Sequence, residues 1–75
     1  MRWITRIFLK NVDKEKLKQM CEKIEQRDNT FSWKIEGNYL FIFSESKEKA
    51  HSRGLLFVKK YLNKFDLGYD VFYKA

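Results

Sequence analysis

The stretch that decides the fold is IFLKNVDKEKLKQMCEKI, residues 7–24. Apolar residues alternate with other residues through positions 2–10, and this period of two predicts a β-strand. Arg6 and Lys10 share one side of that strand, and charged side chains are seldom buried, so this side should face solvent. Phe8 lies on the same side, which places a large aromatic ring where water is expected.

The polar run that follows the strand predicts an amphipathic helix. Asp13 suits the N-cap position, because its carboxylate can accept hydrogen bonds from the first free backbone N–H groups of a helix. Apolar residues then recur at helical spacing and define one buried stripe. The stripe consists of Leu17, Met20, Cys21 and Ile24. The helix should end at the polar residues 27–29.

Residues 30–43 predict a β-hairpin. Gly37 and Asn38 form a two-residue loop with glycine first, as a type II′ turn prefers. Such a short loop fixes the register of the two strands, and the apolar pairs should face the core. The inner pairs are Ile35 with Leu40 and Trp33 with Ile42, and the outer pairs are Glu36 with Tyr39, Lys34 with Phe41 and Ser32 with Phe43.

The rest of the chain predicts a second helix and a last strand. Ser46 should cap a helix that runs to about Phe65, with Gly54 allowing a close approach to the sheet, and a strand follows at residues 69–74. Each predicted helix has one apolar stripe, so both should cover the same face of the sheet. We therefore expect one α+β domain over residues 1–75, a ferredoxin-like βαββαβ sandwich with a four-stranded antiparallel sheet and two helices on one face.

The other face of this sheet would be uncovered and unusually aromatic. Its predicted rings are Phe8, Tyr39, Phe41, Phe43 and Phe72, and its predicted cations are Arg6, Lys10, Lys34 and Lys74. A contiguous exposed aromatic patch usually marks a contact surface. Nucleic-acid bases could stack on the rings while the cations bind phosphates. A protein surface, including a second copy of this chain, could cover the same rings.

Composition favours a binding protein over an enzyme. The net charge of +6 and the isoelectric point of about 9.6 suit an anionic partner, although most of the positive charge lies on the second helix, whose basic face we interpret as solvated. Cys21 and His51 are the only residues of their types, and neither has a partner at catalytic or metal-ligand spacing. We expect no cofactor and no bound metal. No apolar run reaches the ~20 residues of a membrane span, and a lone cysteine fits a cytoplasmic location.

Two short motifs resemble the RNA-recognition-motif family. IFLKNV, residues 7–12, is similar to the family's hexapeptide, which runs aliphatic, aromatic, aliphatic, any residue, asparagine, aliphatic. Tyr39 and Phe41 match the two stacking aromatics of its octapeptide, and Ile42 matches an aliphatic position. The chain departs from the octapeptide at Gly37, Asn38, Leu40 and Ser44. The resemblance implies that Phe8, Tyr39 and Phe41 stack on bases.

Two functions follow as hypotheses. The first is a small domain that binds single-stranded nucleic acid, with RNA favoured over DNA, through the aromatic and basic sheet face. The alternative is a protein-interaction module that uses the same face, either as a homodimer or as an accessory or inhibitor protein of the anti-CRISPR kind. Size and charge alone suggest that inhibitor class.

Overall fold

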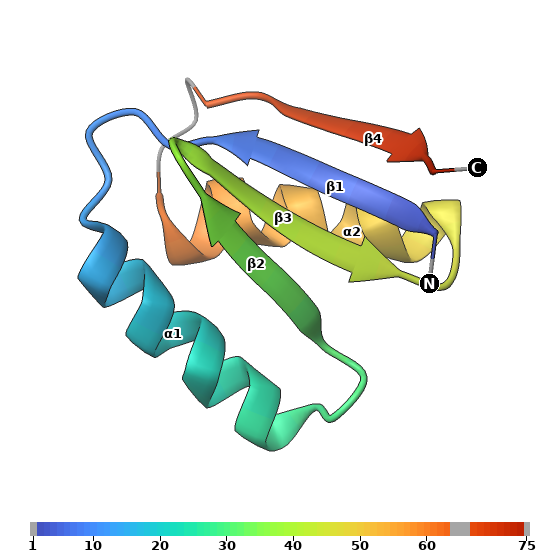
Figure 1. The fold of residues 1–75 in the computed structure, drawn as a ribbon, viewed down its shortest axis with the longest axis horizontal. Helices are drawn as coiled ribbons and strands as arrows, with labels where there is room; N and C mark the ends of the chain where they lie inside the picture. The colour runs from blue at the N-terminus through green and yellow to red at the C-terminus, as the bar shows by residue number, and fades with distance from the viewer. Residues whose placement is uncertain (1, 64–66, 75) are drawn as a thin grey trace.

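The chain is an α+β protein, seen here in a computed structural model that describes residues 2–63 and 67–74. The elements are β1 Trp3–Phe8, α1 Lys14–Arg27, β2 Ser32–Glu36, β3 Tyr39–Ser44, α2 Lys47–Leu56, η1 Phe57–Tyr61 and β4 Tyr69–Tyr73 (Figure 1). The four strands form one antiparallel sheet in the order β2-β3-β1-β4. This arrangement confirms the predicted class and strand number and is compatible with a ferredoxin-like fold.

The predicted hairpin register is confirmed. Ile35 lies opposite Leu40 and Trp33 lies opposite Ile42. Gly37 has a φ of 60°, whereas Asn38 has a negative φ, which is the combination of a type II′ turn. Because side chains alternate along a strand, the turn decides which side chains of β2 and β3 face the core.

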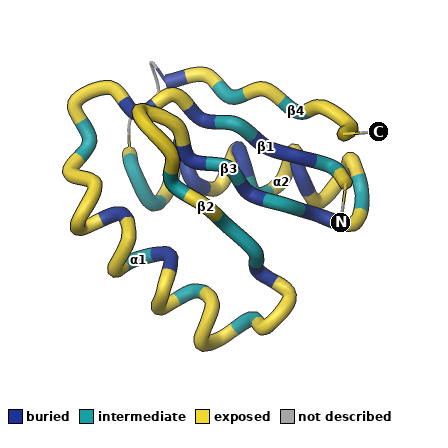
Figure 2. The backbone as a smooth tube through the Cα atoms, in the orientation of Figure 1, coloured by how far each residue is buried: buried dark blue, intermediate teal, exposed yellow. Residues whose placement is uncertain are grey.

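Both helices contribute to a single core on one face of the sheet. In Figure 1, α2 passes behind β1 and β3, and α1 runs along the side of β2. The buried cluster joins α1, η1 and the inner side of the two central strands, through Leu17, Cys21, Phe57, Val58, Ile7, Leu40 and Ile42. Burial is concentrated in the central strands β1 and β3, while most residues of α1, α2 and β4 are exposed (Figure 2). Of the described helices, none combines the length and hydrophobicity needed to cross a membrane.

Both helices start where the sequence predicts, whereas the first strand and the second helix do not end at their predicted positions. Asp13 Oδ1 accepts from the backbone N–H groups of Glu15 and Lys16, and Ser46 Oγ accepts from that of Lys49. The first strand is shorter than predicted, because β1 ends at Phe8 and Asn11 adopts a left-handed φ of 57° that takes the chain out of the sheet.

The second helix does not stay α-helical to its predicted end. After Leu56 it becomes the π-helix η1, whose hydrogen bonds span five residues, and the backbone N–H of Leu62 bonds the carbonyl of Phe57 at 2.8 Å. Asn63 then takes a left-handed φ of 51°, which ends the helical conformation. The predicted helix residues Lys64 and Phe65 lie outside the described residues.

Gly54 permits the close approach that the sequence predicted. A Cβ atom at this position would lie 2.6 Å from Cδ2 and 2.8 Å from Cγ of Tyr69 on β4. Non-bonded carbon atoms do not approach this closely, so a larger residue here would force the ring of Tyr69, or α2 and β4 themselves, to move.

Both tryptophans lie on the core side of the sheet but are only partly buried. The indole Nε1 of Trp33 donates to Glu25 Oε2 on α1 at 3.2 Å. Trp3 packs edge-on against Tyr73, with 5.2 Å between ring centroids. The predicted inner position of both residues is therefore correct, while each ring keeps some exposure at the margin of the core.

Arg53 corrects the interpretation that the basic residues of the second helix are all solvated. Its side chain is only 13% exposed. Its guanidinium donates to the carbonyl of Phe43, to Ser44 Oγ, to Asp28 Oδ2 and to Thr30 Oγ1, at 3.2–3.4 Å. Hydrogen bonds from Thr30 hold the pKa of Asp28 below its usual value, and Arg53 adds to this effect. Arg53 therefore joins α2, the end of α1 and the end of β3.

We expect Arg53→Met to destabilise the fold by about 1–2 kcal/mol, because the fully buried Ser44 hydroxyl and its neighbours lose a charged donor. The measurement is the free energy of unfolding from urea titration. Lys60→Met is the matched control, since Lys60 is an exposed cation on the same helical segment and should change stability by less than about 0.5 kcal/mol. Equal stabilities of the two variants would contradict the role given to Arg53.

Cys21 is expected to be unreactive in the folded protein. The side chain is fully buried on α1, and burial raises the pKa of its thiol to about 12, with added repulsion from Glu25 and Glu22. Because the thiolate is the reactive form, labelling by Ellman's reagent at pH 8 should be at least about 100-fold slower than for a free thiol. Urea should remove the protection at the unfolding transition. Labelling of the native protein at the free-thiol rate would show that α1 does not stay docked.

Candidate functional site

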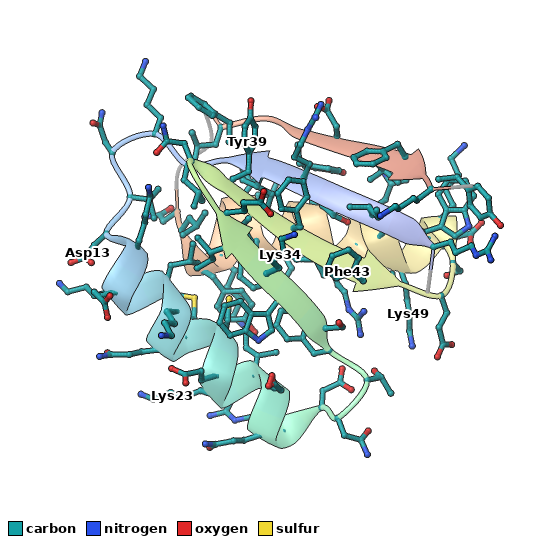
Figure 3. The ribbon with its side chains drawn as sticks, viewed as in Figure 1. Asp13, Lys23, Lys34, Tyr39, Phe43 and Lys49 are labelled. Atoms are coloured by element: carbon teal, nitrogen blue, oxygen red, sulfur yellow. The ribbon has the colours of Figure 1, made fainter. Side chains whose placement is uncertain are left out.

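The sheet face opposite the helices, called here the open sheet face, is organised in rows that run across the strands. Strand pairing places Phe43, Ile4 and Phe72 in one row. The next row contains Phe41, Arg6 and Asp70, and the third contains Tyr39 and Phe8. The five predicted rings and Arg6 therefore meet on one surface. Figure 3 shows Lys34, Tyr39 and Phe43 on the side toward the viewer, with α2 behind the sheet.

Exposure confirms which way the rings point. Phe8 is 46% exposed, Tyr39 38% and Phe72 36%. Phe41 and Phe43 are half-buried. The residues that alternate with them, Ile7, Leu40 and Ile42, are fully buried under the helices. Removing an exposed ring costs a small protein little stability, so the fold does not require these rings and they are available to contact a partner.

Three of the rings follow one another in contact distance across two of these rows and are called here the aromatic platform: Phe8, Tyr39 and Phe41. The ring centroids of Phe8 and Tyr39 lie 5.6 Å apart, and those of Tyr39 and Phe41 lie 6.0 Å apart. Both pairs are tilted at angles of 55° and 41°. The geometry is that of packed aromatic pairs, and it presents ring surface to solvent along the middle of the sheet.

Two cations sit against these rings. The guanidinium of Arg6 lies 5.5 Å from the ring centre of Tyr39 and 5.5 Å from that of Phe72. The ammonium of Lys34 lies 6.0 Å from the ring centre of Phe41. At these distances a cation is attracted to the face of an aromatic ring, which holds the charged groups close to the plane of the platform.

Each of these cations also has a carboxylate partner that the sequence analysis missed. Arg6 Nη2 bonds Asp70 Oδ2 at 2.8 Å, and Lys34 forms an ion pair with Glu36. The bond to Asp70 raises the pKa of Arg6, and the bond from Lys34 lowers the pKa of Glu36. The pairing of Lys34 with Glu36 could have been predicted, because the two residues are two positions apart on one side of β2. The pairing of Arg6 with Asp70 depends on the register of β4, which no short turn fixes.

The two remaining predicted cations lie at the ends of the strands. Lys10 is exposed in the loop after β1, beyond the sheet itself. Lys74 follows β4, and its backbone N–H bonds the carbonyl of Arg2 at 2.8 Å. Within residues 2–63 and 67–74, neither lysine forms an ion pair. The four predicted cations and the carboxylates of Asp70 and Glu36 together carry a net charge of +2.

A hollow of about 330 Å³ opens on the same face, beside the platform. Its lining residues are Ile4, Lys34, Glu36, Phe41, Phe43, Phe72 and Lys74. Ile4 is only 5% exposed although it lies on the uncovered side of β1, because it stands between the larger side chains of Phe43 and Phe72. Alternation along β1 places Ile4 on the same side as Arg6 and Phe8, but the sequence did not reveal the hollow.

No family model, no curated protein and no solved structure matches this chain.

Proposed function

We propose that this chain binds single-stranded nucleic acid, with a preference for RNA, through the open sheet face of a ferredoxin-like βαββαβ domain similar to RNA-recognition motifs. The observation that carries the proposal is the aromatic platform, an unbroken series of three rings on the side of the sheet opposite the described helices. Every base has a flat face, so such a row supports stacking with little dependence on base identity.

The roles follow from position. Phe8, Tyr39 and Phe41 provide stacking surfaces for successive bases, and Phe43 and Phe72 extend the apolar surface toward the opposite end of the strands. Lys10 and Lys74 bind phosphates at the two ends of the open sheet face, where the nucleic-acid strand reaches and leaves it. Arg6 and Lys34 bind phosphates only by sharing or releasing their carboxylate partners. Exposed ion pairs are worth roughly 0–1 kcal/mol, so this exchange is energetically accessible.

The charge distribution sets the expected salt dependence. If two to four cations contact phosphate, the slope of log K against log salt concentration should be about −1.4 to −2.8, at about −0.7 for each phosphate neutralised on a single strand. The exposed lysines of α2 and η1 lie on the opposite side of the sheet and can attract a polyanion without contacting the strand on the platform.

The test is fluorescence anisotropy of a labelled mixed-sequence strand, titrated with the protein at several salt concentrations. We expect binding to single-stranded RNA and DNA, weaker binding to a duplex whose bases are already stacked, and the slope given above. Binding to the duplex that equals binding to the single strand would show that charge alone drives association, which contradicts a stacking role for the platform.

A protein partner is the second candidate, and the ion pairs of the open sheet face are the observation that favours it. Arg6 with Asp70 and Lys34 with Glu36 reduce the positive charge around the rings, as suits a protein surface of mixed polarity. Light scattering separates the two functions. A stable dimer that ignores the labelled strand would support a homodimer through this face, and a monomer that binds the strand supports nucleic acid.

A further inference from the structure

The hollow beside the platform has the dimensions of a slot between two aromatic rings. Phe43 and Phe72 stand on the two strands that flank β1, each opposite Ile4. Neighbouring strands lie about 4.8 Å apart, so the backbones that carry these rings are separated by about 9.6 Å. Among the described residues, the two rings do not form a packed aromatic pair with each other. Ile4 is shorter than either ring and forms the floor of the slot.

The width of this slot suits one flat ring. If Phe43 and Phe72 stand upright over their strands, a ring centred above Ile4 would lie about 4.8 Å from each of them, within the roughly 4.5–7 Å at which aromatic pairs interact favourably. The row of Phe43, Ile4 and Phe72 lies two rows from Tyr39 and Phe8, although the hollow also extends past Phe41 to Glu36, which lies opposite Tyr39. A ring bound over Ile4 would leave Tyr39 and Phe8 free for other bases.

The charges at the margin of the slot indicate what accompanies that ring. Lys74 and Lys34 line the hollow, and only Lys34 has a carboxylate beside it, from Glu36. Lys74 forms no ion pair within the part of the chain that the structure describes. An aromatic slot edged by two ammonium groups and one carboxylate is complementary to a flat aromatic group that carries a negative charge.

We propose that this slot is a separate nucleobase subsite, in which one base of the bound strand lies over Ile4 between Phe43 and Phe72 and its phosphate contacts Lys74. The proposal rests on the proposed function, because it assigns one nucleotide of that same ligand. The bound strand then occupies the slot and the platform together, and its path runs diagonally over the central strands from Lys74 toward Phe8.

The test uses methyl NMR of isotope-labelled isoleucine, because Ile4 reports on the slot and the fully buried Ile42 reports on the opposite side of the sheet. A base above Ile4 should shift its methyl signal upfield through the ring current. We expect this shift with a saturating eight-nucleotide strand and, more weakly, with adenosine 5′-monophosphate. Ribose 5-phosphate, which has no base, should leave the Ile4 signal in place. The Ile42 signal should not move with the strand or with adenosine 5′-monophosphate.

Two variants with matched controls complete the test. Phe72→Leu should weaken strand binding about fivefold or more, whereas Tyr73→Leu, which removes the neighbouring ring on the other side of β4, should not. Lys74→Gln should weaken the binding of adenosine 5′-monophosphate more than that of adenosine, and Lys60→Gln should change the binding of neither.

The outcomes distinguish this inference from the function on which it rests. A strand that binds and requires Phe8, while the Ile4 signal stays in place and Phe72→Leu binds normally, overturns the slot and leaves the platform intact. A shift of Ile4 by adenosine 5′-monophosphate without any strand binding supports a mononucleotide slot and overturns the proposed function. If no strand binds and the Ile4 signal does not shift, the slot and the proposed function are both overturned.

Discussion

Replacing Phe8 and Phe41 together with alanine is expected to weaken binding of a single strand by about 30-fold or more. Each base stacked on an aromatic ring contributes roughly 1–3 kcal/mol, so two lost stacking surfaces remove at least about 2 kcal/mol of binding free energy. Phe8 and Phe41 stand on the two central strands and border Tyr39 on either side, so the double variant leaves one isolated ring. Anisotropy titration at fixed salt concentration measures the effect.

The matched control is the double variant Leu55→Ala and Leu56→Ala. These leucines are 45% and 40% exposed on α2, so the control removes a comparable exposed apolar surface away from the open sheet face. Its affinity should equal that of the original chain. Thermal unfolding should show that both double variants remain folded at the temperature of the titration. If the two double variants bind equally, the platform does not contact the strand.

Gly54→Leu should destabilise the fold by about 2 kcal/mol, the largest effect on stability that we expect from one substitution. Overpacking of this kind costs about 3 kcal/mol at its upper range, and the better helix propensity of leucine offsets about 0.8 kcal/mol. The cost arises because even a Cβ would lie 2.6 Å from the ring of Tyr69, whose side chain also approaches His51. The melting temperature should fall by about 8–16 °C.

Gly68→Ala is the control for this prediction. Among the described residues, no atom lies within 4 Å of the position that its Cβ would take, and its φ is outside the left-handed region. Its stability should stay within about 0.5 kcal/mol of the original or rise slightly, because alanine restricts the unfolded chain. A Tyr69→Ala background supplies the second check, since removing the ring should relieve much of the Gly54→Leu penalty. A penalty that is unchanged in this background would locate the clash elsewhere.

The sequence was sufficient to predict the face on which the rings lie. Period-two alternation in the first strand and the two-residue loop at Gly37 together set which side chains of β1, β2 and β3 point outward. Both signals are local, so they survive without knowledge of the tertiary structure. Asp13 and Ser46 were equally predictable, because a helix cap involves only neighbouring residues.

The features that the sequence did not reveal depend on contacts between distant segments. Arg53 meets Asp28 across 25 positions, and nothing in the helical pattern distinguishes it from the solvated lysines around it. The slot over Ile4 depends on Phe43 and Phe72 standing on either side of β1, which follows from strand order as well as from alternation. The pairing of Arg6 with Asp70 required the register of β4 in the same way.

The π-helical turn at Phe57–Tyr61 has a consequence for how this chain can vary in length. The hydrogen bonds of a π turn span five residues rather than the four of an α turn, so the turn contains about one additional residue. The backbone bond from Leu62 to Phe57 absorbs that residue, so the core contacts before it are undisturbed. A natural variant lacking one residue in this turn would regain regular α-helical bonding and keep Phe57 in place. Length differences among relatives of this protein should therefore concentrate here, whereas the Gly37 turn should not change in length, because an added residue would invert the outward face of a strand.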